Sequence, residues 1–292
     1  MITVFTPTYN RGYCLKNLYE SLCRQTILDF EWIVIDDGST DSTFEMLLNW
    51  QKEAPFSIIV EKQINGGKHR AINKGVKLSN GELFFIVDSD DYIVDNAIEV
   101  IVDVVNKLPK DELYAGVCGL KCFPNGQRVG GDNDWRVLNC TSLDFRYKYK
   151  IKGDMAEVFY THILKEFPFP EINGEKFCPE ALVINRIACK YKIHFFYKCL
   201  YICDYLSDGL TAKITKIRMN SPISSMICYS ELCSYEIPLI QKIKAVINFW
   251  RFSFCSEKRS VSQHMKNIGF WGIFFLPFGL IMYVIDKKKY DS

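Results

Sequence analysis

The sequence predicts an α/β fold in which a mainly parallel central sheet carries helices on both faces, followed by a helical C-terminal region. Three observations support this prediction. Short β-branched and aromatic runs alternate with segments of helical periodicity in the first third of the chain, polar clusters follow three of the expected strands, and apolar helical patterns dominate after about residue 216. Alternation of this kind builds βαβ units, in which helices connect parallel strands.

The expected strands are short and apolar, and they lie at residues 2–5, 32–35, 57–60 and 83–87. Between them, apolar residues recur at helical spacing around Leu18, Leu47 and Ile72. Turn and N-cap residues precede the second helix at 36–42, and Asn65-Gly66-Gly67 interrupts the chain before the third. The first 110 residues therefore predict a βαβαβαβ arrangement.

The pattern becomes irregular after Lys110 and helical again towards the C-terminus. We therefore expect one α/β domain over residues 1–215, with a regular half at 1–110 and an irregular half at 111–215. Residues 216–292 form the expected helical region.

Composition excludes several classes of function. A net charge of +2 in 292 residues does not provide the broad basic surface on which nucleic-acid binding depends, so we expect no nucleic-acid partner. The twelve cysteines are scattered through apolar segments, and no basic leader precedes them. We expect reduced cysteines in a cytoplasmic protein. The cysteine and histidine spacings match no zinc motif.

Three polar clusters fall where parallel strands should end. Residues 6–10 follow the first strand, 36–39 the second and 88–91 the fourth. In a doubly wound sheet, ligands bind at the carboxyl ends of the strands. We therefore expect the three clusters to converge on one binding site.

The cluster after the fourth strand is acidic. Asp88, Asp90 and Asp91 directly follow an apolar run, and three close carboxylates repel one another unless a cation neutralises them. Carboxylate oxygens suit Mg²⁺ or Mn²⁺, which bind one or two carboxylates and complete their coordination with substrate phosphates. A solvated acidic turn that caps a helix near Asp95 is the alternative, and the two neighbouring clusters favour the metal site.

Four motifs, in their order and spacing, resemble the family 2 glycosyltransferases, which are inverting enzymes with the nucleotide-sugar-binding fold called GT-A. The resemblance covers about residues 1–110. The motifs are Thr6-Pro7-Thr8-Tyr9-Asn10-Arg11, Ile35-Asp36-Asp37-Gly38-Ser39-Thr40-Asp41, Asn65-Gly66-Gly67-Lys68 with Ala71, Asn73 and Gly75, and Asp88-Ser89-Asp90-Asp91.

The resemblance implies a nucleoside pocket in the regular half of the domain. The loop that begins with Thr6 and Pro7 would hold the base, with Tyr9 packing on it and a carboxylate of Asp36 or Asp37 accepting from its ring nitrogen. In this family the base is commonly uracil, so the implied donor is a UDP-sugar.

The resemblance also implies the groups around the diphosphate. Lys68 would contact the base or the diphosphate, Asp88 would face the ribose, and Asp90 would bind Mg²⁺ or Mn²⁺. The additional Asp91 leaves the register of this motif open, so Asp91 is a second candidate for the metal.

The catalytic base is expected in the irregular half, which would bind sugar and acceptor. Family members carry an acidic residue at the head of a helix, and Glu180 is the best match, although Ala181 replaces the usual second acid. Glu175 and Asp154 are alternatives, and Glu180 could instead only stabilise the first turn of its helix. Arg186 could reach the diphosphate or remain a solvated helix residue.

The C-terminal run Gly269–Ile285 is uncharged, contains Pro277 and precedes three lysines at 287–289. A spanning helix needs about 20 apolar residues, and this run is shorter. Its aromatic residues and lysines favour a segment that lies on the inner face of the cell membrane. A buried helix, a dimer face or a true span are the alternatives.

These expectations combine into one function, the transfer of a hexose or N-acetylhexosamine from a UDP-sugar to a glycan or lipid-linked acceptor in surface polysaccharide synthesis. Two alternatives remain open. A catalytically inactive sugar-nucleotide-binding or scaffold protein is compatible with Ala181. A sugar-phosphate nucleotidyltransferase is less compatible, because residues 6–12 lack the glycine-rich loop that such enzymes carry.

Overall fold

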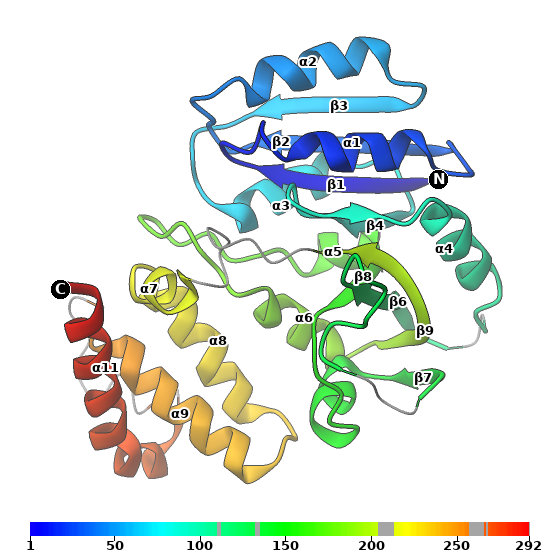
Figure 1. The fold of residues 1–292 in the computed structure, drawn as a ribbon. Helices are drawn as coiled ribbons and strands as arrows, with labels where there is room; N and C mark the ends of the chain where they lie inside the picture. The colour runs from blue at the N-terminus through cyan, green and yellow to red at the C-terminus, as the bar shows by residue number, and fades with distance from the viewer. Residues whose placement is uncertain (110–111, 132–134, 204–212, 257–265, 267, 292) are drawn as a thin grey trace. The chain divides into compact units, whose positions relative to one another are not determined.

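The computed structural model describes all residues except 110–111, 132–134, 204–212, 257–265, 267 and 292, and Figure 1 shows its elements. The chain forms two compact units. Unit 1 comprises Met1–Pro168 and Arg186–Leu206, and unit 2 comprises Phe169–Asn185 and Ser207–Ser292. Unlike the division expected near residue 215, the segment 169–185 groups with the C-terminal helices.

Unit 1 contains a mixed sheet of nine strands among its described residues, in the order β3-β2-β1-β4-β8-β6-β9-β5, with β7 paired to β9. Pairing is parallel among strands β3, β2, β1 and β4, as predicted. Strand β8 pairs antiparallel with β4 and with β6. The strands are β1 (Ile2–Thr8), β2 (Phe30–Asp36), β3 (Ser57–Lys62), β4 (Leu83–Ile86), β5 (Tyr92–Ile93), β6 (Tyr114–Cys122), β7 (Val137–Cys140), β8 (Met155–Tyr160) and β9 (Lys192–Ile202).

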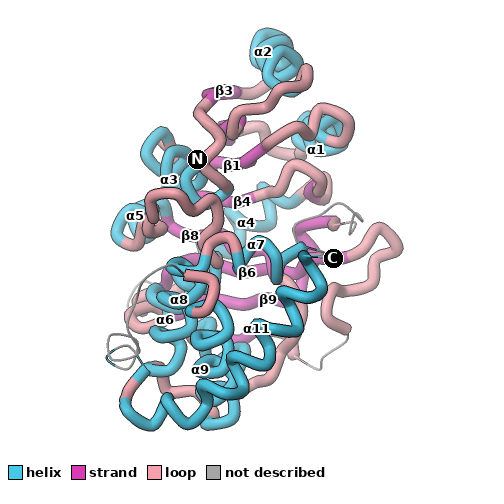
Figure 2. Tube along the Cα trace, turned by 90° about the vertical axis from the view of Figure 1, so that its left-hand side faces the viewer, coloured by secondary structure: helices cyan, strands magenta, loops and turns pink. Residues whose placement is uncertain are grey.

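Helices cover both faces of this sheet. Figure 2 shows α1 and α2 on one side of the strands and α3 and α5 on the other. This arrangement confirms the α/β fold class expected from the sequence. The helices of unit 1 are α1 (Leu15–Cys23), α2 (Thr43–Glu53), α3 (Lys68–Leu78), α4 (Ala97–Asn106) and α5 (Thr161–Glu166), and a π-helical turn spans Asp144–Lys148.

Successive side chains of a strand point to opposite faces of the sheet, so part of the apolar core lies on each face. Val4 and Phe85 pack with Leu18 of α1 in one apolar cluster. On the other face, α3 approaches the sheet so closely that a Cβ atom on Gly75 would lie 2.1 Å from the ring of Phe5. Because Gly75 has no side chain, α3 packs directly against β1. This contact fixes the position of Lys68, the first residue of α3.

Unit 2 is helical, as expected for the C-terminal region. Its core contains Val246, Phe249 and Trp250 of α9. Arg251 donates to both carboxylate oxygens of Asp286, at 2.5 and 2.8 Å, and so ties α9 to α11. The elements are α6 (Glu180–Ala188), which begins in this unit, α7 (Ile214–Met219), α8 (Pro222–Ser234), α9 (Leu239–Ser253), a 3-10 helix (Phe270–Phe275) and α11 (Leu276–Asp291). No disulfide joins any of the twelve cysteines, all of which lie in described residues.

Candidate active site

The three polar clusters of unit 1 lie together at the carboxyl ends of adjacent strands. The loop after β1 contacts the loop after β2, because Asn10 accepts from the backbone N–H of Thr40 at 2.8 Å and its own N–H donates to Ser39 at 2.8 Å. It also contacts the loop after β4, where Arg11 Nη2 lies 3.9 Å from Asp90 Oδ2. The candidate site is therefore built by β1, β2 and β4, with α3 beside them.

The acidic loop, residues 88–91, connects β4 to β5. Asp88 Oδ1 lies 2.5 Å from Nζ of Lys68, the first residue of α3. The side chains of Asp88 and Asp90 are 30% and 23% exposed, so both carboxylates remain accessible. Asp91 is buried, and its Oδ2 accepts a hydrogen bond from Tyr201 at 2.7 Å.

Two residues of this site were missed in the sequence. Tyr201 on β9 is fully buried, and its hydroxyl also accepts from the backbone N–H of Asp88 at 3.0 Å. Lys121 on β6 places its Nζ 4.0 Å from the centre of the Tyr201 ring. Tyr201 lies 110 residues from Asp91 along the chain, and no motif marks either residue. Only the strand pairing brings them to the acidic loop.

Burial and neighbouring charges separate the pKa values of the three carboxyl groups. Burial raises the pKa of Asp88, but the Lys68 and Lys121 ammonium groups outweigh it and bring this pKa below its usual value. Burial and the Asp88 carboxylate raise the pKa of Asp90. Burial, opposed by the Tyr201 hydrogen bond, raises the pKa of Asp91 to about 7. A cation beside Asp90 would relieve the repulsion that raises its pKa.

The described residues contain no group of three or more His, Cys, Asp or Glu side chains that could hold a metal ion by themselves. The donor set nevertheless fits Mg²⁺ or Mn²⁺, because these ions bind through one or two carboxylates and take the remaining oxygens from substrate phosphates and water. Asp90 provides an accessible carboxylate for the metal, whereas an oxygen of Asp88 is paired with Lys68. Asp91 fits less directly, since one of its oxygens already accepts from Tyr201.

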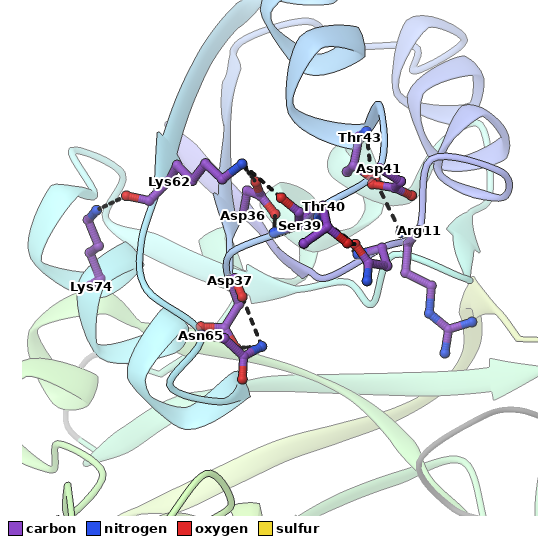
Figure 3. Close-up of polar contacts among 11 residues, drawn as sticks. Arg11, Asp36, Asp37, Ser39, Thr40, Asp41, Thr43, Lys62, Asn65 and Lys74 are labelled. Carbon is purple, nitrogen blue, oxygen red and sulfur yellow. Dashed lines mark hydrogen bonds and ion pairs between the residues drawn. The ribbon is translucent and has the colours of Figure 1, made fainter.

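The residues expected around the base differ in accessibility. Tyr9 is 47% exposed, whereas Thr6 is fully buried and its Oγ1 accepts from the indole N–H of Trp32 at 2.9 Å. Pro7 is half-buried beside them. Asp36 is fully buried, accepts from the N–H of Ser39 at 2.9 Å, and has its second oxygen 3.6 Å from Lys62 Nζ (Figure 3).

Asp37 holds the loop before α3 rather than facing an open cavity. Its carboxylate accepts from the backbone N–H groups of Gly66 and Gly67, both at 2.8 Å. Side-chain amides of Gln63 and Asn65 donate to it as well, at 2.8 and 3.3 Å, and Figure 3 shows the contact with Asn65. This carboxylate therefore fixes the segment that leads directly into Lys68.

Asp37→Ala should weaken donor binding by releasing this segment. A buried group left without its hydrogen-bond partner costs about 1–3 kcal/mol, or roughly a 5- to 150-fold rise in the dissociation constant. Calorimetry with UDP measures this change. The matched control is Lys74→Ala, which removes a half-buried cation of α3 that pairs with Glu61 and should leave affinity unchanged. Unchanged UDP affinity in Asp37→Ala and also in Asp36→Ala would mean that the pocket is misplaced.

The candidates for the catalytic base have different surroundings. Glu180 is exposed and is the first residue of α6, in unit 2. Asp154 is exposed directly before β8. The Glu175 carboxylate accepts from the backbone N–H groups of Ile223 and Ser224 at 2.6 and 2.8 Å, and so caps the N-terminus of α8. Glu175 therefore has a structural role that accounts for its burial.

Comparison with known proteins identifies a family. A model of glycosyl transferase family 2 matches residues 3–154. Glycosyltransferase GlyG of Streptococcus pneumoniae serotype 4 is 33% identical over 111 residues, which are 38% of this chain and 37% of GlyG. Poly(ribitol-phosphate) beta-glucosyltransferase of Bacillus spizizenii is 35% identical over 100 residues, which are 33% of this chain and 16% of that protein. The matches thus span less than half of either relative.

Solved structures share the fold. The structure of S. aureus TarS 1-349 in complex with UDP has a TM-score of 0.64 and 17% identity, and the match covers 100% of this chain and 92% of that one. The mannosyltransferase PcManGT from Pyrobaculum calidifontis, in complex with GDP-Man and Mn²⁺, has a TM-score of 0.57 and 16% identity, with 100% and 87% covered. These likenesses establish the GT-A fold. Because the family model covers more than half of the chain and contains all four motifs, the chain belongs to glycosyl transferase family 2.

Proposed function

We propose that the protein is an inverting, metal-dependent glycosyltransferase that uses a UDP-sugar. The observation that carries this proposal is the acidic loop at the carboxyl ends of parallel strands, with the cations of Lys68 and Arg11 beside it. Accessible carboxylates next to fixed ammonium and guanidinium groups suit a bound diphosphate with its metal ion. The proposed sugar is a hexose or N-acetylhexosamine, and the acceptor is a glycan or a lipid-linked glycan of a surface polysaccharide.

The names of relatives support the choice of donor and acceptor. TarS has been solved with UDP and with UDP-GlcNAc, and the Bacillus relative is named for glucosyl transfer to poly(ribitol-phosphate). Related curated proteins include the chondroitin synthase and the hyaluronan synthase of Pasteurella multocida, each 28% identical over 137 residues, 46% of this chain and 14% of either relative.

The donor is held by residues from all three loops. Tyr9 stacks on the base and Pro7 lies beside it, while the fully buried Thr6 and Asp36 support these residues from the strand ends. Asp37 keeps the loop before α3 in place. A bound Mg²⁺ or Mn²⁺ would supply charge stabilisation for the departing diphosphate.

The remaining groups act on the diphosphate and on the acceptor. Asp88 faces the ribose, Asp90 holds the metal with Asp91 as a second candidate, and Lys68 binds the diphosphate. Glu180 takes the proton of the acceptor hydroxyl while that oxygen bonds to the anomeric carbon. The bond between this carbon and the diphosphate oxygen breaks, and UDP leaves with the bonding electrons. The configuration at the anomeric carbon is thereby inverted.

Nucleotide release from UDP-, GDP- and dTDP-sugars, with and without Mn²⁺, tests this function directly. We expect release of UDP from one UDP-hexose or UDP-N-acetylhexosamine, and only with the metal. Pyrophosphate formation from a sugar phosphate and UTP would instead identify a nucleotidyltransferase. Tight UDP binding without turnover on any donor and acceptor would identify an inactive binding or scaffold protein.

We further propose that the C-terminal segment attaches the enzyme to the inner face of the cell membrane. One helical segment of the described residues, Phe270–Tyr290, is long and apolar enough to cross a membrane, and its most apolar window is 17% buried. Five large apolar side chains recur along it at helical spacing, and each is more than half exposed. They are Phe270 (73%), Phe274 (70%), Phe278 (55%), Ile281 (57%) and Ile285 (60%). We call them the apolar stripe.

The contacts of α11 support a helix that lies on a bilayer rather than one that crosses it. Gly279 packs against α9, since a Cβ atom there would lie 2.4 Å from the Trp250 side chain. The ion pair between Arg251 and Asp286 holds the same helix further along. A spanning helix would have to break both contacts, whereas docking needs only the apolar stripe. Lys287 and Lys288 next to the stripe suit anionic headgroups.

Phe270→Ser together with Phe274→Ser should lower binding to phosphatidylglycerol vesicles at least about tenfold, because each buried phenylalanine contributes about 1.5–3 kcal/mol. Co-sedimentation measures the bound fraction. The control is Leu113→Ser, which removes an equally exposed side chain (71%) from unit 1. Equal binding of the double variant, or a lipid-free dimer that this variant dissociates, would contradict membrane docking.

A further inference from the structure

One hydroxyl group connects the first and the last residue of the acidic loop. The Tyr201 hydroxyl accepts from the backbone N–H of Asp88 at 3.0 Å and donates to Asp91 Oδ2 at 2.7 Å. Its side chain is fully buried. A buried hydroxyl that uses both its donor and an acceptor position has one preferred orientation, so it restrains both of its partners.

The ring that carries this hydroxyl is itself held in place. Lys121 lies directly opposite Tyr201 in the parallel pairing of β6 with β9, and its ammonium group sits 4.0 Å from the ring centre. Phe85, in the strand that precedes the acidic loop, meets the ring edge-on at a centroid distance of 6.2 Å. The cation and the aromatic edge leave the Tyr201 ring little freedom to turn.

We propose that Tyr201 is a positioning residue for metal and donor binding. Its hydroxyl fixes the loop at Asp88 and Asp91 and thereby fixes the carboxylate of Asp90 between them. This inference rests on the proposed function, in which Asp90 binds the metal together with the donor diphosphate. Mg²⁺ and Mn²⁺ sites require closely placed oxygens, and supporting hydrogen bonds provide that placement.

Tyr201→Phe tests the proposal because it removes only the hydroxyl and keeps the ring. Mn²⁺ binding in the presence of UDP is measured by electron paramagnetic resonance, and UDP binding by calorimetry with chelator and with saturating Mn²⁺. We expect the Mn²⁺ dissociation constant to rise about tenfold or more, as for loss of a hydrogen bond to a charged group. UDP affinity should fall less in chelator than in saturating Mn²⁺, since Tyr201 supports the nucleoside pocket only through Asp88.

Tyr160→Phe is the matched control. It removes a tyrosine hydroxyl from the same sheet, at a position opposite Leu83 where β4 begins, and it should change neither affinity nor thermal midpoint. Equal Mn²⁺ binding by wild type and Tyr201→Phe would overturn the positioning role and leave the proposed function standing. Absence of any Mn²⁺ effect on UDP binding in the wild type would overturn both. Unfolding of Tyr201→Phe alone would make the hydroxyl a stability element and overturn the inference.

Discussion

Asp90→Ala is expected to reduce sugar transfer at least about a thousandfold and to weaken donor binding in the presence of Mn²⁺. The substitution removes the carboxylate that we assign to the metal, and without the metal the charge that grows on the departing diphosphate is not stabilised. The fold should persist, because the long contact with Arg11 at 3.9 Å is at most a weak ion pair. Turnover of the UDP-sugar and calorimetry with UDP and Mn²⁺ measure the two effects.

A second carboxylate outside the loop provides the control for this result. Asp95 pairs with Arg24 at the surface, at 3.1 Å, so Asp95→Ala should keep normal activity and metal dependence. Excess chelator should reproduce the effect of Asp90→Ala in the wild type. Full activity of Asp90→Ala, or of the wild type in chelator, would refute the metal assignment.

Glu180→Gln is expected to lower the turnover number by about two to four orders of magnitude while donor affinity stays nearly constant. Glutamine keeps the size and hydrogen-bonding capacity of the side chain but cannot accept the proton of the acceptor hydroxyl. A group that acts only in the transition state affects turnover rather than binding. Single-turnover kinetics at saturating donor and acceptor separate these two quantities.

Variants of the other acidic candidates serve as the comparison for this experiment. Glu175→Gln should lower the thermal midpoint by weakening the cap of α8 and leave turnover of the folded enzyme unchanged. If Asp154→Asn or Glu175→Gln abolishes turnover while Glu180→Gln stays active, the base lies elsewhere. Loss of donor binding in Glu180→Gln would make Glu180 a substrate-positioning or structural residue.

The regular half of the fold was predictable because its signals are local. Each of the strands β1 to β4 is an apolar run bounded by turn residues, and each helix between them has its own apolar periodicity. The acidic loop was recognisable for the same reason, since Asp88, Asp90 and Asp91 follow one another directly after such a run. Parallel pairing then places the ends of neighbouring strands side by side, so the association of the three loops also follows from the pattern.

The contacts that organise the site were not predictable because they depend on distant segments. Tyr201 reaches the acidic loop through the pairing of β9 with β5, in which it lies opposite Ile93. Lys121 reaches it through the pairing of β6 with β9. The two aspartates at the end of β2 are adjacent and chemically identical in the sequence. Asp37 nevertheless holds the backbone of Gly66 and Gly67, whereas Asp36 accepts from the N–H of Ser39. The grouping of residues 169–185 with the C-terminal helices likewise reflects tertiary packing that no local composition marks.

The position of β9 has a consequence for how the protein is made. This strand lies inside the sheet, between β6 and β5, but it is translated after the chain has left unit 1 at Pro168. At about 5–20 residues per second, a ribosome that has finished β6 at Cys122 needs several more seconds to reach Tyr201 in β9. Until then β6 has a free hydrogen-bonding edge, which invites pairing with other nascent chains. Slow codons or a shortage of chaperones in this interval should therefore favour aggregation.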